Sequence, residues 1–218
     1  MASTNHWYTP VPDPSRYFPF PRSFRPTSAD TETHFEYMEA LGSDAACVTF
    51  LCQTHGGVRI VVKFAQTYGR DAHVLLASHD MAPALLYCGP IEPSESAPSY
   101  GSIKMIAMEY IDGSLLPQLE TAQHNAVSTT GSLAQQLKDA VNVLHEGGYV
   151  YGDLRGQNIM VTNEGKVKLI DFDWAGRVGE ARYPPFLSTI DWPHGVEAFG
   201  TIEATHDQQM LVRLIASL

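Results

Sequence analysis

Two polar turns that flank a predicted β-hairpin limit most strongly what this chain can fold into. The turn GDLRGQN carries Asp153 and Asn158, and the later segment LIDFDW carries Asp171. Between them, NIMVT and KVKLI read as two strands joined by an Asn-Glu-Gly turn. A hairpin returns the chain to its starting point, so we expect Asp171 to lie beside Asp153 and Asn158.

Two carboxylates and one carboxamide provide the oxygen ligands that Mg²⁺ prefers. We therefore expect Asp153, Asn158 and Asp171 to bind a phosphate group together with Mg²⁺. The alternative is that the two aspartates only cap the backbone of their own turns. Because both turns occur together and in this order, we favour the phosphate site.

The first half of the chain alternates short apolar runs, rich in β-branched and aromatic residues, with turn signals. We expect five strands, at FEYMEALG, ACVTFLC, VRIVVKF, ALLYCG and SIKMIAMEYI. His55-Gly56-Gly57 predicts a hairpin between the second and third. RDAHVLLASHD has the apolar spacing of a helix and ends before Pro83.

The second half has a different pattern. SLAQQLKDAVNVLHEGG predicts a helix with Ser132 as its N-cap and a Gly-Gly stop. A last helix is expected at about 206–215, and residues 174–200, rich in Pro and Gly, read as a long ordered loop. The predicted fold class is α+β, with a five-stranded antiparallel sheet and one helix followed by a truncated, mainly helical part.

Residues 1–33 form a proline- and aromatic-rich N-terminal arm. Its prolines exclude a helix or a central strand. It is either extended and disordered or partly docked through its aromatic side chains, and the sequence leaves both open. The remaining predicted units are residues 34–112 and 113–218.

Charge and cysteine content limit the partners and the compartment. The formal net charge is −10, from 24 acidic and 14 basic residues, which argues against a nucleic-acid partner and weakly against an anionic membrane. No signal-peptide pattern and no apolar run of 18 residues occurs. Three cysteines without a C-x-x-C pair are expected to be buried free thiols in a reducing, cytoplasmic setting: Cys47, Cys52 and Cys88.

The turns and their spacing resemble the protein-kinase superfamily over roughly residues 35–215. The family's catalytic loop reads H-R-D-L-x-x-x-N and its metal motif D-F-G. Here VYGDLRGQN and DFD stand in those places. The resemblance implies a bilobal protein-kinase-like fold, with residues 34–112 as the N-lobe, residues 113–218 as a truncated C-lobe and a hinge near residue 110.

The resemblance also implies a role for each matching polar residue. Asp153 would accept the proton of a substrate hydroxyl, and Arg155 would lie near the γ-phosphate of ATP. Asn158 and Asp171 would hold Mg²⁺. Lys63, in RIVVKF, matches the lysine of V-A-I-K and would contact the α- and β-phosphates. The alternative for Lys63 is an edge residue whose head group reaches solvent.

The segment MEYIDG resembles the hinge that binds the nucleotide base. By resemblance, Met108 is the gatekeeper, and Glu109 and Ile111 offer backbone groups to adenine. Val61 and Met160 would sandwich the base. Such apolar residues usually serve the core as well.

Five positions either depart from the family pattern or have two alternative roles. Gly42 stands alone where the family has G-x-G-x-x-G. His73 takes the place of the helix glutamate that pairs with the lysine, unless it is an ordinary amphipathic helix residue, and Asp71 could substitute only if the helix rotates. Asp173 replaces the glycine of D-F-G, and would bind a second ion or face solvent. Asp207 resembles the aspartate that supports the catalytic loop, or is a simple charge at a helix N-terminus.

Two further resemblances are narrower. Gly-Asp in the catalytic loop and D-F-D-W resemble aminoglycoside- and choline-type small-molecule kinases. The combination of VKF, GDLR-x-x-N and IDFDWAG resembles short fungal kinase-like chains.

Two functions remain open. The first is an ATP- and Mg²⁺-dependent phosphotransferase that acts on a hydroxyl of a protein Ser/Thr or of a small molecule. The second is a pseudokinase, a nucleotide-binding or protein-interaction scaffold, which the missing glycines, the missing glutamate and the short C-lobe favour. A variant of the pseudokinase hypothesis is a purely structural domain that binds no nucleotide. A distance between Lys63 and Asp171 that one phosphate chain could bridge would argue against this variant.

Overall fold

A computed structural model describes the chain over residues 20–26, 31–42, 48–91, 100–118 and 127–218. Three features of the sequence analysis lie wholly or largely outside these ranges: most of the N-terminal arm, the stretch that follows Gly42, and Cys47. None of the described helices has the length and apolarity needed to cross a bilayer.

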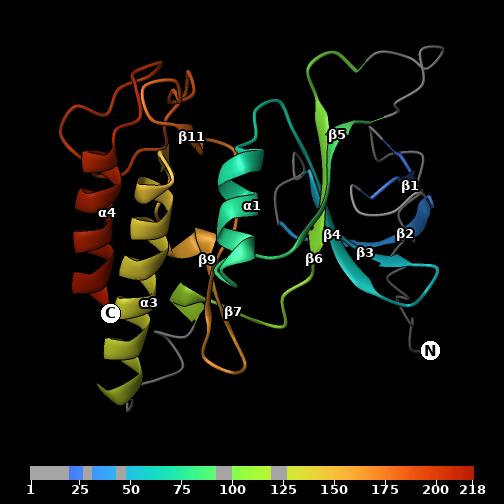
Figure 1. Ribbon diagram of the computed structural model, residues 1–218, viewed down its shortest axis with the longest axis horizontal. Helices are drawn as coiled ribbons and strands as arrows, with labels where there is room; N and C mark the ends of the chain where they lie inside the picture. The colour runs from blue at the N-terminus through green and yellow to red at the C-terminus, as the bar shows by residue number, and fades with distance from the viewer. Residues whose placement is uncertain (1–19, 27–30, 43–47, 92–99, 119–126) are drawn as a thin grey trace, which may run out of the picture.

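A six-stranded antiparallel sheet forms the first half of the molecule (Figure 1). Its strands, in spatial order, are β1 (Ser23–Phe24), β2 (Thr33–Ala40), β3 (Thr49–Thr54), β4 (Arg59–Ala65), β6 (Lys104–Glu109) and β5 (Leu85–Pro90). The hairpin predicted at His55-Gly56-Gly57 joins β3 to β4, and Gly57 has a φ of 81°. That positive φ suits a glycine in a tight turn.

The prediction of five strands was wrong by one, because β1 adds a sixth. Ser23 and Phe24 of the predicted arm pair with β2. The Phe24 side chain is 5% exposed, and its ring lies 6.0 Å from Phe35 and 5.8 Å from Tyr87. An edge strand tolerates nearby prolines since one side of it needs no ladder partner. This end of the arm is therefore docked on the sheet.

The rest of the described fold consists of the helices α1 (Arg70–Ser78), α3 (Val127–Glu146) and α4 (Ala204–Ser217), helical residues at 116–118, the short 3-10 helix η2 (Gly156–Asn158) and two small sheets. Helix α1 lies between the large sheet and the pair α3 and α4, as Figure 1 shows. It contacts both β5 and α3. The small sheets are β10 (Val167–Leu169), β9 (Ile159–Thr162) and β7 (Gly113–Leu115), and β11 (Gly176–Arg177) with β8 (Tyr149–Val150).

Several elements of the second half differ in extent from the predicted ones. Helix α3 begins at Val127, so Ser132 lies inside it and is not its N-cap. No proline separates the two positions, and apolar spacing alone does not mark where a helix begins. The loop predicted at 174–200 contains β11, whose Gly176 pairs with Val150. The predicted last helix is α4, extended by two residues at each end.

The side chains of strand β4 point alternately into two apolar cores, one on each face of the large sheet. Ile60, Val62 and Phe64 pack into a core on one face of the large sheet. Val61 and Ala65 belong to a core on the other face, which joins α1, α3 and α4 and includes Leu76, Leu137 and Phe172. Because side chains of a strand alternate, Lys63 lies on the second face, toward the helices.

Candidate functional site

Lys63 is buried and paired with two carboxylates. Only 7% of the residue is exposed. Its Nζ lies 2.7 Å from Oδ1 of Asp171 and 2.9 Å from Oδ1 of Asp173. Burial lowers the pKa of Lys63, but the two carboxylates more than offset this, and the pKa lies above its ordinary value. The interpretation of Lys63 as a solvent-reaching edge lysine was therefore wrong.

The end of the predicted hairpin does return to its beginning. Strands β9 and β10 pair through Val161 and Val167, and the amide of Ile170 donates to the carbonyl of Asn158 at 2.9 Å. The Tyr151 hydroxyl donates to the carbonyl of Ile170. Asp171 follows with a φ of 65°, a left-handed conformation that is uncommon for non-glycine residues and that Asp80 and Phe199 share in this structure.

The buried residues Asp153 and Asn158 form one hydrogen-bonded group with the half-buried Arg155. The Asn158 amide nitrogen donates to the Asp153 carboxylate at 2.8 Å and to its carbonyl at 2.9 Å. Arg155 approaches both carboxylate oxygens of Asp153 at 2.6 Å. Burial raises the pKa of Asp153, and the hydrogen bonds from Arg155 and Asn158 oppose the rise without cancelling it. A carboxylate in this state is suited to accept a proton.

Asp207 of α4 stabilises the start of this turn through hydrogen bonds to its backbone. Its carboxylate, fully buried, accepts the amides of Tyr151 at 2.8 Å and Gly152 at 2.7 Å, and contacts His145 at 3.1 Å. The start of α4 is capped instead by a reciprocal bond between Glu203 and His206. The interpretation of Asp207 as a simple helix charge was therefore wrong, and its role in supporting the loop is confirmed.

Helix α1 supplies Lys63 with no carboxylate. His73 is fully buried; its Nδ1 contacts the Tyr68 hydroxyl at 2.7 Å and its Nε2 contacts the Pro83 carbonyl at 2.8 Å. Its ring stacks on Phe172 with centroids 4.5 Å apart. Burial lowers the pKa of His73 to about 4, so it is neutral near pH 7. Asp71 is exposed and pairs with Arg70 at 3.6 Å, so the helix has not rotated it toward Lys63.

The Asp173 side chain does not simply face solvent, which was one of the two alternatives expected for it. It pairs with Lys63, and burial together with the neighbouring Asp171 raises its pKa to about 6. Its backbone is held by the turn before α1, since the Thr67 hydroxyl donates to the Asp173 carbonyl at 2.9 Å. The Gly69 amide donates to Phe172 at 2.8 Å, and a Cβ at Gly69 would lie 2.3 Å from the carbonyl oxygen of Ala175.

The residues expected around a nucleotide base come from three elements. Val61 of β4 and Met108 of β6 are opposite each other in the large sheet. The Glu109 amide already donates to Ala84 at 2.9 Å. Ile111 is buried, and Met160 is half-buried in β9 opposite Leu115 of β7.

The described residues offer a cation few protein ligands. They contain no cluster of three or more His, Cys, Asp or Glu side chains arranged to hold a metal ion. Mg²⁺ bound with a phosphate needs only one or two carboxylates, since water and phosphate supply the rest. The half-exposed carboxylate of Asp171 and the oxygen of the Asn158 amide, whose nitrogen is bonded to Asp153, fit that requirement.

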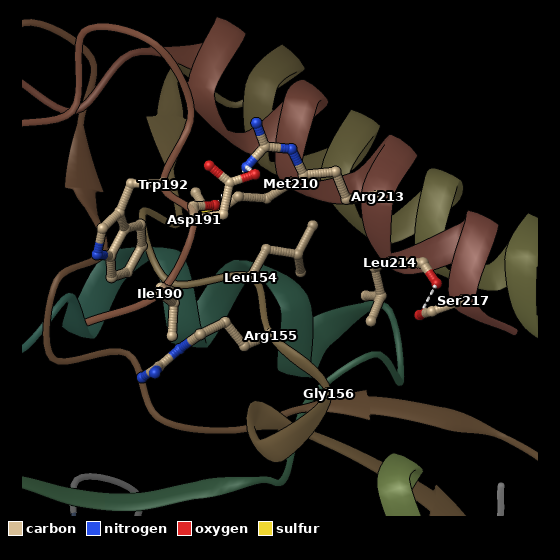
Figure 2. A pocket seen from close by; sticks show the side chains of 10 residues that line it. All are labelled: Leu154, Arg155, Gly156, Ile190, Asp191, Trp192, Met210, Arg213, Leu214 and Ser217. Atoms are coloured by element: carbon tan, nitrogen blue, oxygen red, sulfur yellow. Dashed lines mark hydrogen bonds and ion pairs between the residues drawn. The ribbon is translucent and has the colours of Figure 1, made fainter. Parts of the chain in front are cut away.

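A groove of about 260 Å³, lined in part by Leu154, Arg155 and Gly156, was not anticipated from the sequence. Figure 2 shows its walls, which come from the turn at 154–156, the segment at 190–192 and α4, with the Arg155 side chain along one side. The Arg155 guanidinium lies 5.8 Å from the ring centre of Trp192. Opposite, Asp191 and Arg213 form an ion pair at 3.2 Å. The sequence signal that could have pointed to this region is a tryptophan, Trp192, within a Pro- and Gly-rich loop.

Comparison with known proteins connects this geometry to kinases. Residues 95–193 match the protein kinase domain family. The chain is 26% identical to protein kinase PINOID 2 of Arabidopsis thaliana over 74% of its own length and 32% of that protein. It is 38% identical to the probable serine/threonine-protein kinase mkcF of Dictyostelium discoideum over 34% of its length and 11% of that protein.

A third relative, Aurora kinase C of Mus musculus, is 27% identical over 40% of this chain and 32% of that protein. The chain thus spans about a third or less of the length of the curated relatives it matches.

Proposed function

Because the chain belongs to the protein-kinase-like superfamily, we propose that it transfers the γ-phosphoryl group of ATP, bound with Mg²⁺, to a hydroxyl acceptor. The observation that carries this proposal is the 2.7 Å contact between Lys63 and Asp171, which lie 108 residues apart in the sequence. A cation for phosphate and a carboxylate for magnesium at this distance can both reach one phosphate chain. A purely structural domain would have no need to bury such a pair.

Each polar residue has a proposed task. Asn158 and Asp171 hold Mg²⁺, which when bound neutralises charge on the phosphates. Lys63 donates to the α- and β-phosphates. Asp153 accepts the proton of the acceptor hydroxyl as its oxygen bonds to the γ-phosphorus and the bond to ADP breaks. Arg155 orients Asp153 in the free protein and lies near the transferred group.

The base is proposed to lie between Val61 and Met160, beside Met108. Since the Glu109 amide is committed to Ala84, the carbonyl of Glu109 and the backbone of Ile111 are the groups left for adenine. The acceptor is proposed to be a protein Ser or Thr, because a relative that is 38% identical over 34% of this chain is named a probable serine/threonine-protein kinase. A small-molecule hydroxyl is the other acceptor class that the same chemistry allows.

Thermal unfolding with millimolar ADP or ATP, with and without Mg²⁺, tests the nucleotide site. A ligand at 100 times its Kd stabilises a protein by about 2.7 kcal/mol, which raises Tm by roughly 5–10 °C for a chain of this size. We expect a rise that requires Mg²⁺ and is lost in Asp171→Ala. The absence of any nucleotide effect on the wild type would contradict the proposal.

A pseudokinase is the second candidate, and one contact favours it. Arg155 engages both carboxylate oxygens of Asp153, so the proposed base is already partnered. In that case the protein binds Mg²⁺ and nucleotide but does not turn over. ATP labelled at the γ-phosphate and incubated with micromolar protein separates the two functions. Label transferred to water or to a mixture of acceptor proteins indicates a phosphotransferase, and no transfer indicates a pseudokinase.

A further inference from the structure

Lys63 carries a buried positive charge that must keep an anionic partner when the site works. Buried charges are costly unless they are paired. Its two carboxylate partners are Asp171 at 2.7 Å and Asp173 at 2.9 Å. The proposed function assigns Asp171 to Mg²⁺, so that carboxylate cannot also serve the lysine fully. One of the two contacts is then lost or weakened during nucleotide binding.

The neighbouring helix offers no replacement for Asp171. His73, a fully buried residue of α1, is hydrogen-bonded to Tyr68 and Pro83 and stacked on the ring of Phe172. The α1 carboxylate, Asp71, is exposed and pairs with Arg70. Within the described part of the chain, Asp173 is thus the anionic partner that remains for Lys63.

The backbone of Asp173 is held by the same turn that follows the strand of Lys63. The Thr67 hydroxyl donates to the Asp173 carbonyl, and Gly69 donates to the carbonyl of the preceding residue, Phe172. Gly69 approaches Ala175 too closely to leave room for any side chain. Lys63 and Asp173 are therefore fixed to one another through a short, tightly packed connection rather than through the rest of the molecule.

We propose that Asp173 is the positioning residue of Lys63: it holds the ammonium group toward the phosphates when Asp171 turns to Mg²⁺. This inference rests on the proposed nucleotide site and adds to it the residue that replaces an anion from α1. Asp173 acts through Lys63 and touches neither the reacting atoms nor the metal.

The first test examines the pair without nucleotide or metal. Five lysines occur in the chain, so the side-chain ammonium of Lys63 can be assigned by NMR with ¹⁵N-labelled lysine. A buried, paired ammonium exchanges its protons slowly and gives a signal, whereas a solvated one does not. We expect the Lys63 signal to persist in Asp171→Asn and to disappear in the variant that carries both Asp171→Asn and Asp173→Asn. Loss of the signal in Asp171→Asn alone would overturn the inference.

The second test measures MgADP affinity and the Mg²⁺ requirement by calorimetry. Asp173→Asn should weaken MgADP about tenfold, as expected for a lost charge-assisted contact. It should add nothing in a Lys63→Met background, since the two residues act as a pair. Asp173→Glu should restore part of the affinity. Asp71→Asn, an exposed aspartate of the adjacent helix, is the matched control and should leave the affinity unchanged.

The remaining outcomes separate this inference from the proposed function. If Asp173→Asn raises the Mg²⁺ concentration needed for ADP binding tenfold or more, also in the Lys63→Met background, Asp173 is a metal ligand and the inference is wrong. A wild type that binds no MgADP would overturn the proposed function. The NMR signal would then show Asp173 to be only a structural partner of Lys63.

Discussion

We call the turn at 152–158 the catalytic turn, after the role proposed for Asp153, and the group of Lys63, Asp171 and Asp173 the lysine face. Both regions hold buried charge, but they hold it in different ways. In the catalytic turn, Asp207 accepts two backbone amides that fix the turn from below. On the lysine face, three charged side chains compensate one another. Hydrogen bonds to the backbone stabilise the charge in the catalytic turn, whereas ion pairs between side chains stabilise it on the lysine face.

This difference indicates which region responds to ligands and solution conditions. Hydrogen bonds between a buried carboxylate and backbone amides persist over a wide range of conditions because nothing in the turn competes for them. A cluster of one ammonium and two carboxylates changes when a cation or a phosphate enters it. We therefore expect the catalytic turn to determine turnover and stability, and the lysine face to determine ligand dependence.

The largest expected effect is on turnover. Asp153→Asn removes the proposed proton acceptor but keeps the shape of the side chain. We expect kcat for phosphoryl transfer to fall by about 10²–10⁴, the contribution of a general base, with MgADP affinity unchanged. Radiolabelled transfer, with ATP hydrolysis as the acceptor-independent readout, measures the change. Wild-type turnover in the variant would show that Asp153 does not take the proton.

Asp207→Ala tests the support beneath the catalytic turn. Two backbone amides, of Tyr151 and Gly152, would lose their buried acceptor, and such orphaned groups cost about 1–3 kcal/mol each. We expect a loss of about 4 kcal/mol and a fall in Tm of about 10 °C. Asp191→Ala is the control, because its side chain is 91% exposed and its surface ion pair with Arg213 is worth about 1 kcal/mol or less. Equal effects in the two variants would contradict the support role.

His73, which stacks on Phe172 between Asp171 and Asp173, should make the stability of the protein depend on pH. The pKa of His73 is lowered from 6.5 to about 4 by burial. As pH falls from 6.5 toward 4, the unfolded chain binds a proton there that the folded protein does not, so stability decreases. The slope approaches about 1.4 kcal/mol per pH unit, for a total of about 3 kcal/mol.

Urea unfolding of the wild type and of His73→Gln between pH 4 and 7.5 measures this contribution. The difference between the two proteins isolates His73 from Asp173, whose raised pKa acts in the opposite direction. His55→Gln, at an exposed position, serves as the control. If the variant kept the wild-type slope below pH 6.5, His73 would not be the group that titrates.

Gly69→Ala is expected to have the smallest effect and to act on the lysine face alone. A Cβ at this position would lie 2.3 Å from the Ala175 carbonyl oxygen, so the contact between the turn and the DFD segment must open. We expect a cost of about 2 kcal/mol, as for other overpacked sites, and weaker MgADP binding. At Gly56 the nearest atom would be 3.7 Å away, so Gly56→Ala should change neither quantity.

The catalytic turn was more predictable from the sequence than the lysine face was. A hairpin must return to its start, so the closeness of Ile170 to Asn158 followed from strand pattern and turn type alone. The two faces of β4 were not predicted, although the alternation of side chains along a strand carries this information: it puts Lys63 with Val61, on the opposite face from Ile60 and Val62. Local periodicity carries this information over a few residues.

The partners of Lys63 were not predictable in this way. They come from residues 108 and 110 positions later, and only the packing of α1 decides whether its own side chains or those of the DFD segment face the ammonium. The sequence pointed to His73 as the altered position but not to Asp173 as the partner. β1 was missed because a strand of two residues shows no periodicity.

Calorimetric titration of the wild type with ADP, once with saturating Mg²⁺ and once with EDTA, tests most directly whether Lys63, Asn158 and Asp171 form one magnesium-nucleotide site. We predict binding that is at least tenfold tighter with Mg²⁺, and a loss of that difference in Asp171→Ala. Equal affinity under both conditions, or no binding under either, would contradict the site.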